Sequence, residues 1–154
     1  MLSTGKKIAA PGAGLAILCF FLPWVLASCG DQPLGSFSGW QLAAGTFVGS
    51  GENVQPVPGR PVLFLVPLAG LVVIALAFFA WQRGGFTKMD GAALIGSGTL
   101  PLIVLFWQLT RAQQEAAQQG VTVAYQYGLW GVVLGYITVI VGGVLDMLTQ
   151  QRRA

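Results

Sequence analysis

Four long apolar segments without a charged residue dominate the chain. They comprise residues 8–27, 61–82, 91–110 and 121–145. A membrane-spanning helix needs about 20 mostly apolar residues, and backbone groups in hydrocarbon must find their hydrogen bonds within the segment. The pattern therefore predicts an all-α fold, a four-helix transmembrane bundle that forms a single domain over residues 1–154.

The first connection, residues 28–60, is long and rich in glycine, proline and serine. Within it, Ser38 has the chemistry of a helix N-cap and Gly45 that of a helix stop, so we expect a short helix between them. Residues 55–61 contain three prolines and should be extended, with Pro61 in the first turn of the next helix.

The other two connections are shorter. We expect residues 83–90 to form a tight turn around two glycines, with Asp90 as the N-cap of the third helix. Residues 111–119 contain strong helix formers and no helix breaker. The third helix should therefore continue for about two turns beyond the membrane.

Basic residues predict the orientation of the bundle, because cytoplasmic loops of membrane proteins carry an excess of lysine and arginine. With the N-terminus inside, six basic residues fall on the cytoplasmic side and two fall outside. The six are Lys6, Lys7, Arg83, Lys88, Arg152 and Arg153, and the two are Arg60 and Arg111. We therefore expect a bacterial cytoplasmic (inner) membrane protein with both termini in the cytoplasm.

Aromatic residues agree with this arrangement, because indole and phenol rings favour the membrane–water interface. Trp24, Trp107 and Trp130 lie near the expected outer ends of three helices, and Trp81 lies near the inner end of another. Trp107, Tyr125, Tyr127 and Trp130 should cluster at the outer interface. We expect them to anchor the bundle, and a border to a quinone ring or a lipid stays open.

The composition supports a membrane location and removes several kinds of chemistry. Of the 154 residues, 55% are hydrophobic and only 8% are charged, whereas soluble domains are about 25% charged. The chain has no histidine, the commonest metal ligand and general base near neutral pH. Two cysteines make no zinc site by themselves, and a net charge of +3 gives no reason to expect a nucleic-acid partner.

Cys19 and Cys29 are expected to be unpaired. Helical geometry over the ten residues between them gives a separation of about 15 Å, too far for a disulfide. Leu26-Ala27-Ser28-Cys29 also has the form of a bacterial lipobox. Because four-residue motifs recur by chance in apolar chains, we expect residues 8–27 to be a retained helix and not a targeting segment. Whether Cys29 is ever lipidated stays open.

Small residues form a regular face on each of two expected helices. Such faces let helix backbones approach closely in a membrane, where no hydrophobic force drives helices together. We expect them to pack within the bundle, and the alternative is docking to helices of another subunit. The residues are Gly128, Gly131, Gly135, Thr138 and Gly142 in the fourth helix, and Ala9, Gly12 and Ala16 in the first.

No charged residue lies within the four apolar segments. Asp146 directly follows the fourth segment and is expected to be a satisfied carboxylate at the inner interface. Pairing with Arg83 or Lys88 and a role in carrying a proton both stay open. Transporters and proton pumps place charged residues at mid-depth. Their absence from the segments argues against ion or proton translocation by this chain.

Two short motifs carry a resemblance to known proteins: Phe21-Leu22-Pro23-Trp24-Val25 followed by Ser28-Cys29, and Ser38-Gly39-Trp40-Gln41-Leu42-Ala43. The chain resembles small bacterial four-helix membrane proteins of unassigned function. It also looks like a small membrane subunit of the alternative complex III of filamentous phototrophs, which passes electrons from menaquinol to a periplasmic acceptor. The resemblance implies that haem and iron–sulfur clusters are bound only by partner subunits.

These observations predict a non-catalytic accessory subunit of a larger membrane electron-transfer complex, which stabilises the assembly by helix packing. The chain itself is not expected to be an enzyme, to bind a cofactor or metal, or to take a small-molecule substrate. Its expected partners are larger integral membrane subunits and lipids. The alternative is a stand-alone small carrier or channel, which would need a polar path between the helices.

Overall fold

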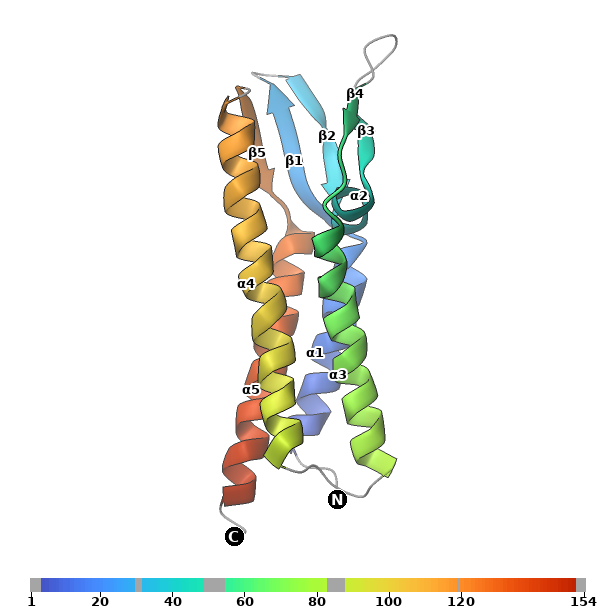
Figure 1. Ribbon diagram of the computed structural model, residues 1–154, viewed down its shortest axis with the longest axis vertical. Coiled ribbons are helices and arrows are strands. Elements are labelled where there is room, and N and C mark those ends of the chain that lie inside the picture. The colour runs from blue at the N-terminus through green and yellow to red at the C-terminus, as the bar shows by residue number, and fades with distance from the viewer. Residues whose placement is uncertain (1–3, 30–31, 49–54, 83–87, 119, 152–154) are drawn as a thin grey trace.

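The computed structural model describes residues 4–29, 32–48, 55–82, 88–118 and 120–151. Four long helices lie side by side, and a small β-structured region extends beyond them at one end (Figure 1). Helix α1 begins, and helix α5 ends, at the opposite end. The helices are α1 (Thr4–Phe20), α3 (Leu65–Gln82), α4 (Lys88–Gln118) and α5 (Tyr127–Gln151), with a 3-10 helix, η1 (Pro61–Phe64), leading into α3.

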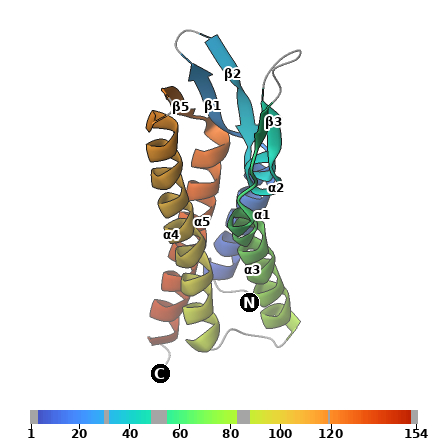
Figure 2. The same cartoon turned by 45° about the horizontal axis from the view of Figure 1, so that its top comes forward.

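The β-structured region contains two small antiparallel sheets. The first has the strand order β2–β1–β5, and the second is a β3–β4 hairpin. Figure 2 shows β1 and β2 projecting beyond the helices, with β5 beside the upper part of α4. The strands are β1 (Pro23–Cys29), β2 (Gln32–Ser38), β3 (Thr46–Val48), β4 (Gln55–Val57) and β5 (Val121–Tyr125), with helix α2 (Gly39–Ala44) between β2 and β3. The fold is mostly helical, and the all-α prediction is corrected by these sheets.

Helix α1 ends at Phe20, so the prediction of a helix over residues 8–27 is wrong in its last part. Pro23 has no backbone N–H to donate to the carbonyl of Cys19, four residues earlier. That carbonyl instead accepts a hydrogen bond from the indole Nε1 of Trp24 at 2.8 Å. The chain continues from Pro23 as β1, whose backbone groups pair with β2 on one side and β5 on the other.

The fourth apolar segment begins as a strand. Residues Val121–Tyr125 form β5, and α5 starts only at Tyr127, so the prediction of a helix over 121–145 is wrong at its start. β-Branched residues in this stretch favour extended backbone. Pairing with β1, from Val25 opposite Tyr125 to Cys29 opposite Val121, satisfies one edge of the strand.

The short helix expected in the outer segment is confirmed as α2. The Ser38 hydroxyl accepts a hydrogen bond from the Gln41 amide at 3.3 Å, and the Gln41 side chain accepts one from the Ser38 amide at 2.9 Å. These reciprocal bonds form a capping box. Gly45 ends the helix with φ of 89°, a conformation that glycine adopts without steric cost. The Arg60 amide donates to the Leu42 carbonyl at 2.9 Å, which ties α2 to the segment before η1.

The boundaries of η1 and α4 decide the remaining helix predictions. Pro61 is the first residue of η1, as expected. Helix α4 begins at Lys88, so Asp90 lies in its first turn and the N-cap assignment is wrong. The extension of this helix beyond the apolar segment is confirmed, because α4 continues to Gln118. The tight turn expected before α4 falls on residues 83–87, outside the described part of the chain.

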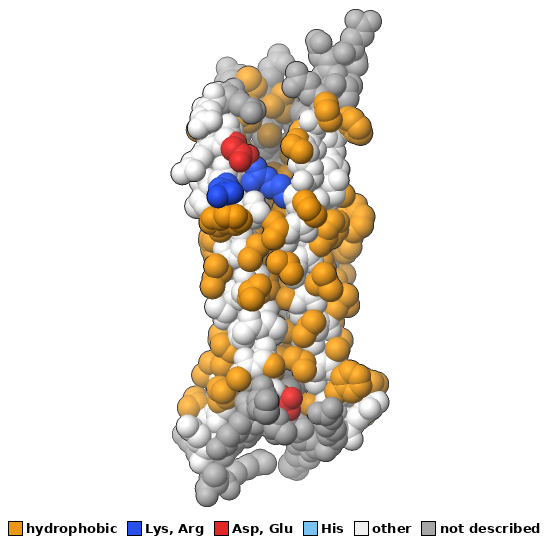
Figure 3. Space-filling model, in the orientation of Figure 1, with side chains coloured by type: hydrophobic (Ala, Val, Ile, Leu, Met, Phe, Trp, Pro, Cys, Tyr) orange, Lys and Arg blue, Asp and Glu red, His pale blue; other side chains and the backbone are white. Residues whose placement is uncertain are grey.

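Three described helical segments are long and apolar enough to cross a membrane: Pro61–Gln82, Asp90–Gln118 and Tyr127–Thr149. The apolar part of α1, Lys7–Phe20, is shorter. At a rise of 1.5 Å per residue it is about 21 Å long, whereas the hydrocarbon core of a bilayer is about 30 Å thick. On the face shown in Figure 3, apolar side chains cover the helical part, with charged side chains toward both of its ends. These features indicate a membrane protein.

Buried side chains form two core clusters. Trp24, expected at the membrane interface, is instead fully buried in the larger cluster. Its ring contacts Phe20 edge-on, with centroids 5.5 Å apart, and an ideal Cβ on Gly39 would lie 2.6 Å from it. The larger cluster joins α1 and α5 to β1, α2 and η1, and the smaller one comprises Ala9, Ala13, Val73, Leu94 and Val139.

Candidate functional site

The small faces of the first and last helices pack against each other. An ideal Cβ on Gly131 would lie 2.4 Å from the Sγ of Cys19, and one on Gly135 would lie 3.0 Å from the Cβ of Ala16. Neither position leaves room for a side chain, so the backbones of α1 and α5 approach closely. In this structure the two faces are used within the chain.

The other small residues of the two faces lie along the same interface. An ideal Cβ on Gly128 would lie 2.5 Å from the carbonyl oxygen of Pro23, and one on Gly12 would lie 3.0 Å from the Cβ of Thr138. Ala9 and Gly142 are buried as well. The contact of α5 with α1 therefore runs from Gly131 to Thr138, and Gly128 continues it against the residues that follow α1.

Tyr136 is a buried polar residue that the sequence analysis did not single out. Its side chain is fully buried, and its hydroxyl donates a hydrogen bond to the carbonyl of Val66. Buried hydroxyl groups need such a partner, and here the bond links α5 to the first turns of α3. The available sequence signal was its place directly after Gly135, beside the tightly packed face.

An open apolar groove lies between α3 and α4. Its volume is about 370 Å³, and its lining comprises Leu65, Leu68, Ala69, Val72, Gly96, Ser97, Leu100 and Pro101. In each of these two helices, only 22% of the residues in the most apolar 18-residue stretch are buried, compared with 50% in α5. An ideal Cβ on Gly96 would meet no atom within 4 Å. The run Gly96-Ser97-Gly98 was a signal for this groove that the sequence analysis missed.

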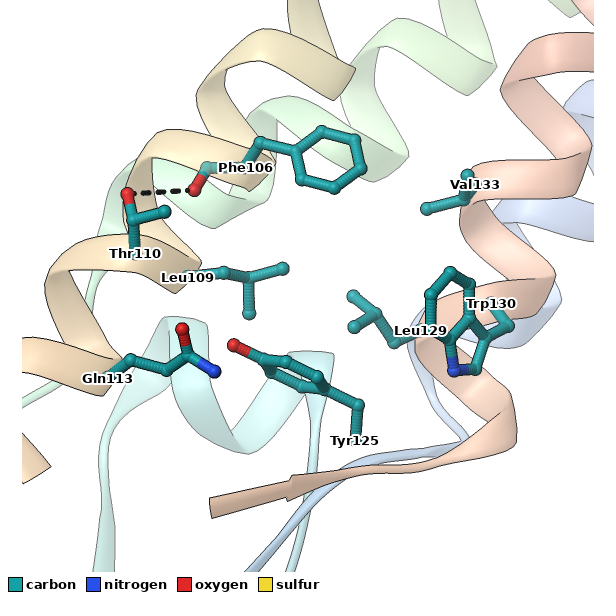
Figure 4. Close-up of a pocket in the computed structure, with 8 residues that line it drawn as sticks. All are labelled: Phe106, Leu109, Thr110, Gln113, Tyr125, Leu129, Trp130 and Val133. Carbon is teal, nitrogen blue, oxygen red and sulfur yellow. Dashed lines mark hydrogen bonds between the residues drawn. The ribbon is translucent and has the colours of Figure 1, made fainter. Parts of the chain in front are cut away.

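Two of the four predicted border aromatics meet in one pocket at the end of the helices nearest the sheets. Tyr125 and Trp130 line a cavity of about 180 Å³ between α4, β5 and α5 (Figure 4). Trp107 lies outside the lining, with the Arg111 guanidinium 4.1 Å from its ring centroid, and Tyr127 is also outside and 65% exposed. The other lining residues are Phe106, Leu109, Thr110, Gln113, Leu129 and Val133.

Arg60 links the outer segment to α4. Its guanidinium donates a hydrogen bond to the side chain of Gln108 at 3.0 Å and forms an ion pair with Glu115. Arg60 directly precedes one apolar segment and Arg111 directly follows another. Both cations therefore border the apolar part of the helices at the end nearest the sheets.

The remaining candidate groups lie apart from one another. Cys19 is buried, Cys29 is exposed, and both are free thiols. Asp146 is 1% exposed near the end of α5, while Arg83 and the side chain of Lys88, its candidate partners, lie outside the described residues. Within the described ranges, no group of three His, Cys, Asp or Glu residues is arranged to hold a metal ion.

Comparison with known proteins assigns no family. The chain matches no protein-family model, and no curated protein is similar enough to count as a relative. Three features of the structure bear on function: the contact between α1 and α5, the groove between α3 and α4, and the pocket beside Tyr125.

Proposed function

We propose that the chain is a non-catalytic accessory subunit of a larger membrane complex, and that a helix of a partner subunit packs into the groove between α3 and α4. The observation that carries this proposal is the groove itself, which is apolar and open along the spanning part of both helices. Helices associate in membranes through close van der Waals contact at small residues. Ala69 and Gly96 offer such contact, whereas Gly131 and Gly135 of α5 are already packed against α1.

We also propose four spans with both termini in the cytoplasm. Helix α1 is short, but it lies antiparallel to α5 from Gly131, beside Cys19, to Thr138, beside Gly12. Because α1 overlaps α5 over this length, it lies at the same depth as a helix long enough to span the membrane, which supports a membrane crossing by α1. The pairing of β1 with β5 continues the contact between the same two segments beyond the helices. The excess of lysine and arginine at the end where α1 begins supports a cytoplasmic location for that end.

The narrower proposal is a bacterial inner-membrane complex that transfers electrons from menaquinol. Its support is the resemblance of residues 21–25 and 38–43 to the small subunits of alternative complex III. In such an assembly the haem and iron–sulfur centres belong to partner subunits. This chain supplies packing surface and covers part of a larger subunit against lipid.

The test is co-purification of the tagged full-length chain from its native membrane in mild detergent, followed by native gel separation and mass spectrometry. We expect larger membrane subunits, including haem proteins, in the same band. Gly96→Leu should reduce partner recovery at least tenfold, because the new side chain fills the groove without meeting the chain's own atoms. Gly14→Leu is the matched control, because an ideal Cβ there also meets no atom within 4 Å.

Two outcomes would overturn the accessory-subunit role, and two others would remove narrower parts of the proposal. Migration of the native chain as a monomer or small homo-oligomer would remove the accessory role, and ion flux through the purified chain in vesicles would favour the channel. Recovery of partners that contain no redox centre would keep the packing role and remove the electron-transfer assignment. Equal recovery with Gly96→Leu and Gly14→Leu would show that partners bind elsewhere.

A further inference from the structure

The pocket beside Tyr125 has a polar end and an apolar end. In Figure 1, α4 runs upward and α5 runs downward. Figure 4 accordingly shows Phe106 and Val133 toward one end of the pocket, and Gln113 and Tyr125 toward the other end, beside β5. The Gln113 amide and the Tyr125 hydroxyl therefore lie at the end of the pocket nearest the sheets, and hydrocarbon side chains line the other end. The Thr110 hydroxyl is engaged with the backbone, because it donates to the carbonyls of Phe106 and Trp107. This order matches an amphiphile whose head lies at the interface and whose tail lies in the bilayer.

The lining contains no charged side chain. The nearest cation in the sequence, Arg111, lies over the ring of Trp107, which is not part of the pocket. Arg60 is engaged with Gln108 and Glu115. A charged head group would therefore lose its hydration here without gaining an opposite charge. The pocket favours an uncharged head that accepts or donates hydrogen bonds.

The size of the cavity limits the group that enters it. At about 180 Å³ it is smaller than pockets for whole drug-sized ligands, which begin near 300 Å³. It is comparable to an apolar cavity of about 150 Å³ that holds a benzene ring. The cavity is thus suited to one ring, with the rest of the ligand at its open side. Rings of Phe106, Tyr125 and Trp130 line it and offer faces and edges for stacking.

Tyr125 supplies a hydrogen-bond donor that persists across the neutral range. Partial burial raises the pKa of its phenol above the ordinary value of 10.0. Figure 4 shows its hydroxyl directed toward the side-chain amide of Gln113. A phenol O–H and an amide N–H on one side of a ring-sized cavity are complementary to one carbonyl oxygen of a planar ring, which has two lone pairs to accept both bonds.

We propose that this pocket binds the head group of a membrane quinone, with the ring beside Tyr125 and Gln113 and the isoprenoid tail leaving along Phe106 and Val133. The inference rests on the proposed function only for the membrane placement of α4 and α5. It concerns binding and assigns no electron transfer to this chain. A phospholipid fits less well, because its charged phosphate has no cation in the lining.

The experiment uses the purified full-length chain in detergent, incubated with a naphthoquinone that carries two isoprene units. After gel filtration in quinone-free buffer, quinone is extracted and measured per chain. The native protein should retain about one per chain. Val133→Phe fills the apolar end and should reduce retention at least fivefold. Tyr125→Phe and Gln113→Leu should each weaken binding about threefold to tenfold, the effect of losing one hydrogen bond.

Leu134→Phe is the matched control for Val133→Phe. Leu134 is the neighbouring residue, is 59% exposed and lies outside the pocket lining, so this variant should retain quinone like the native chain. Tyr125→Phe and Gln113→Leu keep the test valid if Val133→Phe fails to fold. Equal retention in all variants, or retention of phospholipid in place of quinone, would falsify the quinone site.

The outcome is separable from that of the assembly proposal. Val133→Phe should leave partner recovery from native membranes unchanged, because Val133 lies outside the α3–α4 groove. Gly96→Leu should leave quinone retention unchanged for the same reason. Loss of quinone binding in Gly96→Leu would contradict a site confined to the pocket.

Discussion

Gly12 of α1 and Gly135 of α5 meet backbone to backbone. An ideal Cβ on Gly12 would lie 2.8 Å from the carbonyl oxygen of Gly135, and one on Gly135 would lie 2.7 Å from the carbonyl oxygen of Gly12. Both distances are shorter than side-chain carbons tolerate. Because the contact is reciprocal, a side chain at either position would push the same two backbones apart.

Gly135→Leu is therefore expected to destabilise the fold by about 2 kcal/mol or more, since overpacked side chains force backbone shifts. The measurement is reversible unfolding in mixed micelles, followed by circular dichroism. Gly14→Leu should be nearly neutral, because its position on α1 has open space for a Cβ. If the two variants unfold at the same denaturant concentration, α1 and α5 do not pack through this face.

Tyr136→Phe removes the hydroxyl that donates to the Val66 carbonyl. Hydrogen bonds between membrane helices contribute roughly 0.6–2 kcal/mol, so we expect a loss of about 1 kcal/mol in the same unfolding assay. Tyr127→Phe is the control, because Tyr127 is 65% exposed and should change stability little. A neutral Tyr136→Phe would mean that the contact between α5 and α3 does not depend on this bond.

The ion pair between Arg60 and Glu115 should contribute little and depend on salt. Their side chains are 29% and 60% exposed, and exposed pairs typically contribute less than about 1 kcal/mol. A double-mutant cycle with Arg60→Met and Glu115→Gln measures the coupling, which should shrink as the salt concentration rises. The cycle of Arg111→Met with Glu115→Gln should show no more than the roughly 0.3–0.5 kcal/mol of an exposed i, i+4 helix pair, because the Arg111 guanidinium lies over the ring of Trp107. A strong coupling that salt leaves unchanged would contradict this expectation.

The two cysteines report the topology. Cys29 is exposed at the end of β1 and Cys19 is buried against Gly131. With the sheet outside, a membrane-impermeant maleimide applied to intact cells should label Cys29 and leave Cys19 unlabelled until the protein is denatured. Cys29→Ser should abolish the labelling. Protection of Cys29 in intact cells, with labelling after lysis, would place the sheet in the cytoplasm, and a diacylglyceryl mass at Cys29 would show lipidation.

The sequence located the middle helices well and the ends of the outer two poorly. Segment 61–82 coincides with η1 and α3, and segment 91–110 lies within α4. Hydropathy identifies apolar stretches but does not separate a buried strand from a buried helix. Pro23 and the β-branched residues of β5 were the available local signals, and the pairing of β1 with β5 joins residues far apart in the chain.

The candidate sites show the same limit. Periodic small residues revealed a face for close contact on α5 and a second one on α1, but no pattern along the chain showed that these two faces pack against each other. Tyr125 and Trp130 were expected at the outer interface, whereas Gln113 and Val133 become their neighbours only when α4, β5 and α5 are packed together. Trp24 was misplaced because an indole suits both an interface and a core.

The pairing of α1 with α5, continued by β1 with β5, joins the first part of the chain to the last. During synthesis α1 leaves the ribosome long before α5 is made. Its small-residue face is therefore not yet covered by α5 while the rest of the chain is inserted into the membrane. Closure of the molecule is then a late event that depends on the last apolar segment. A chain truncated before α5 would leave the small-residue face of α1 uncovered and open to contact with other helices.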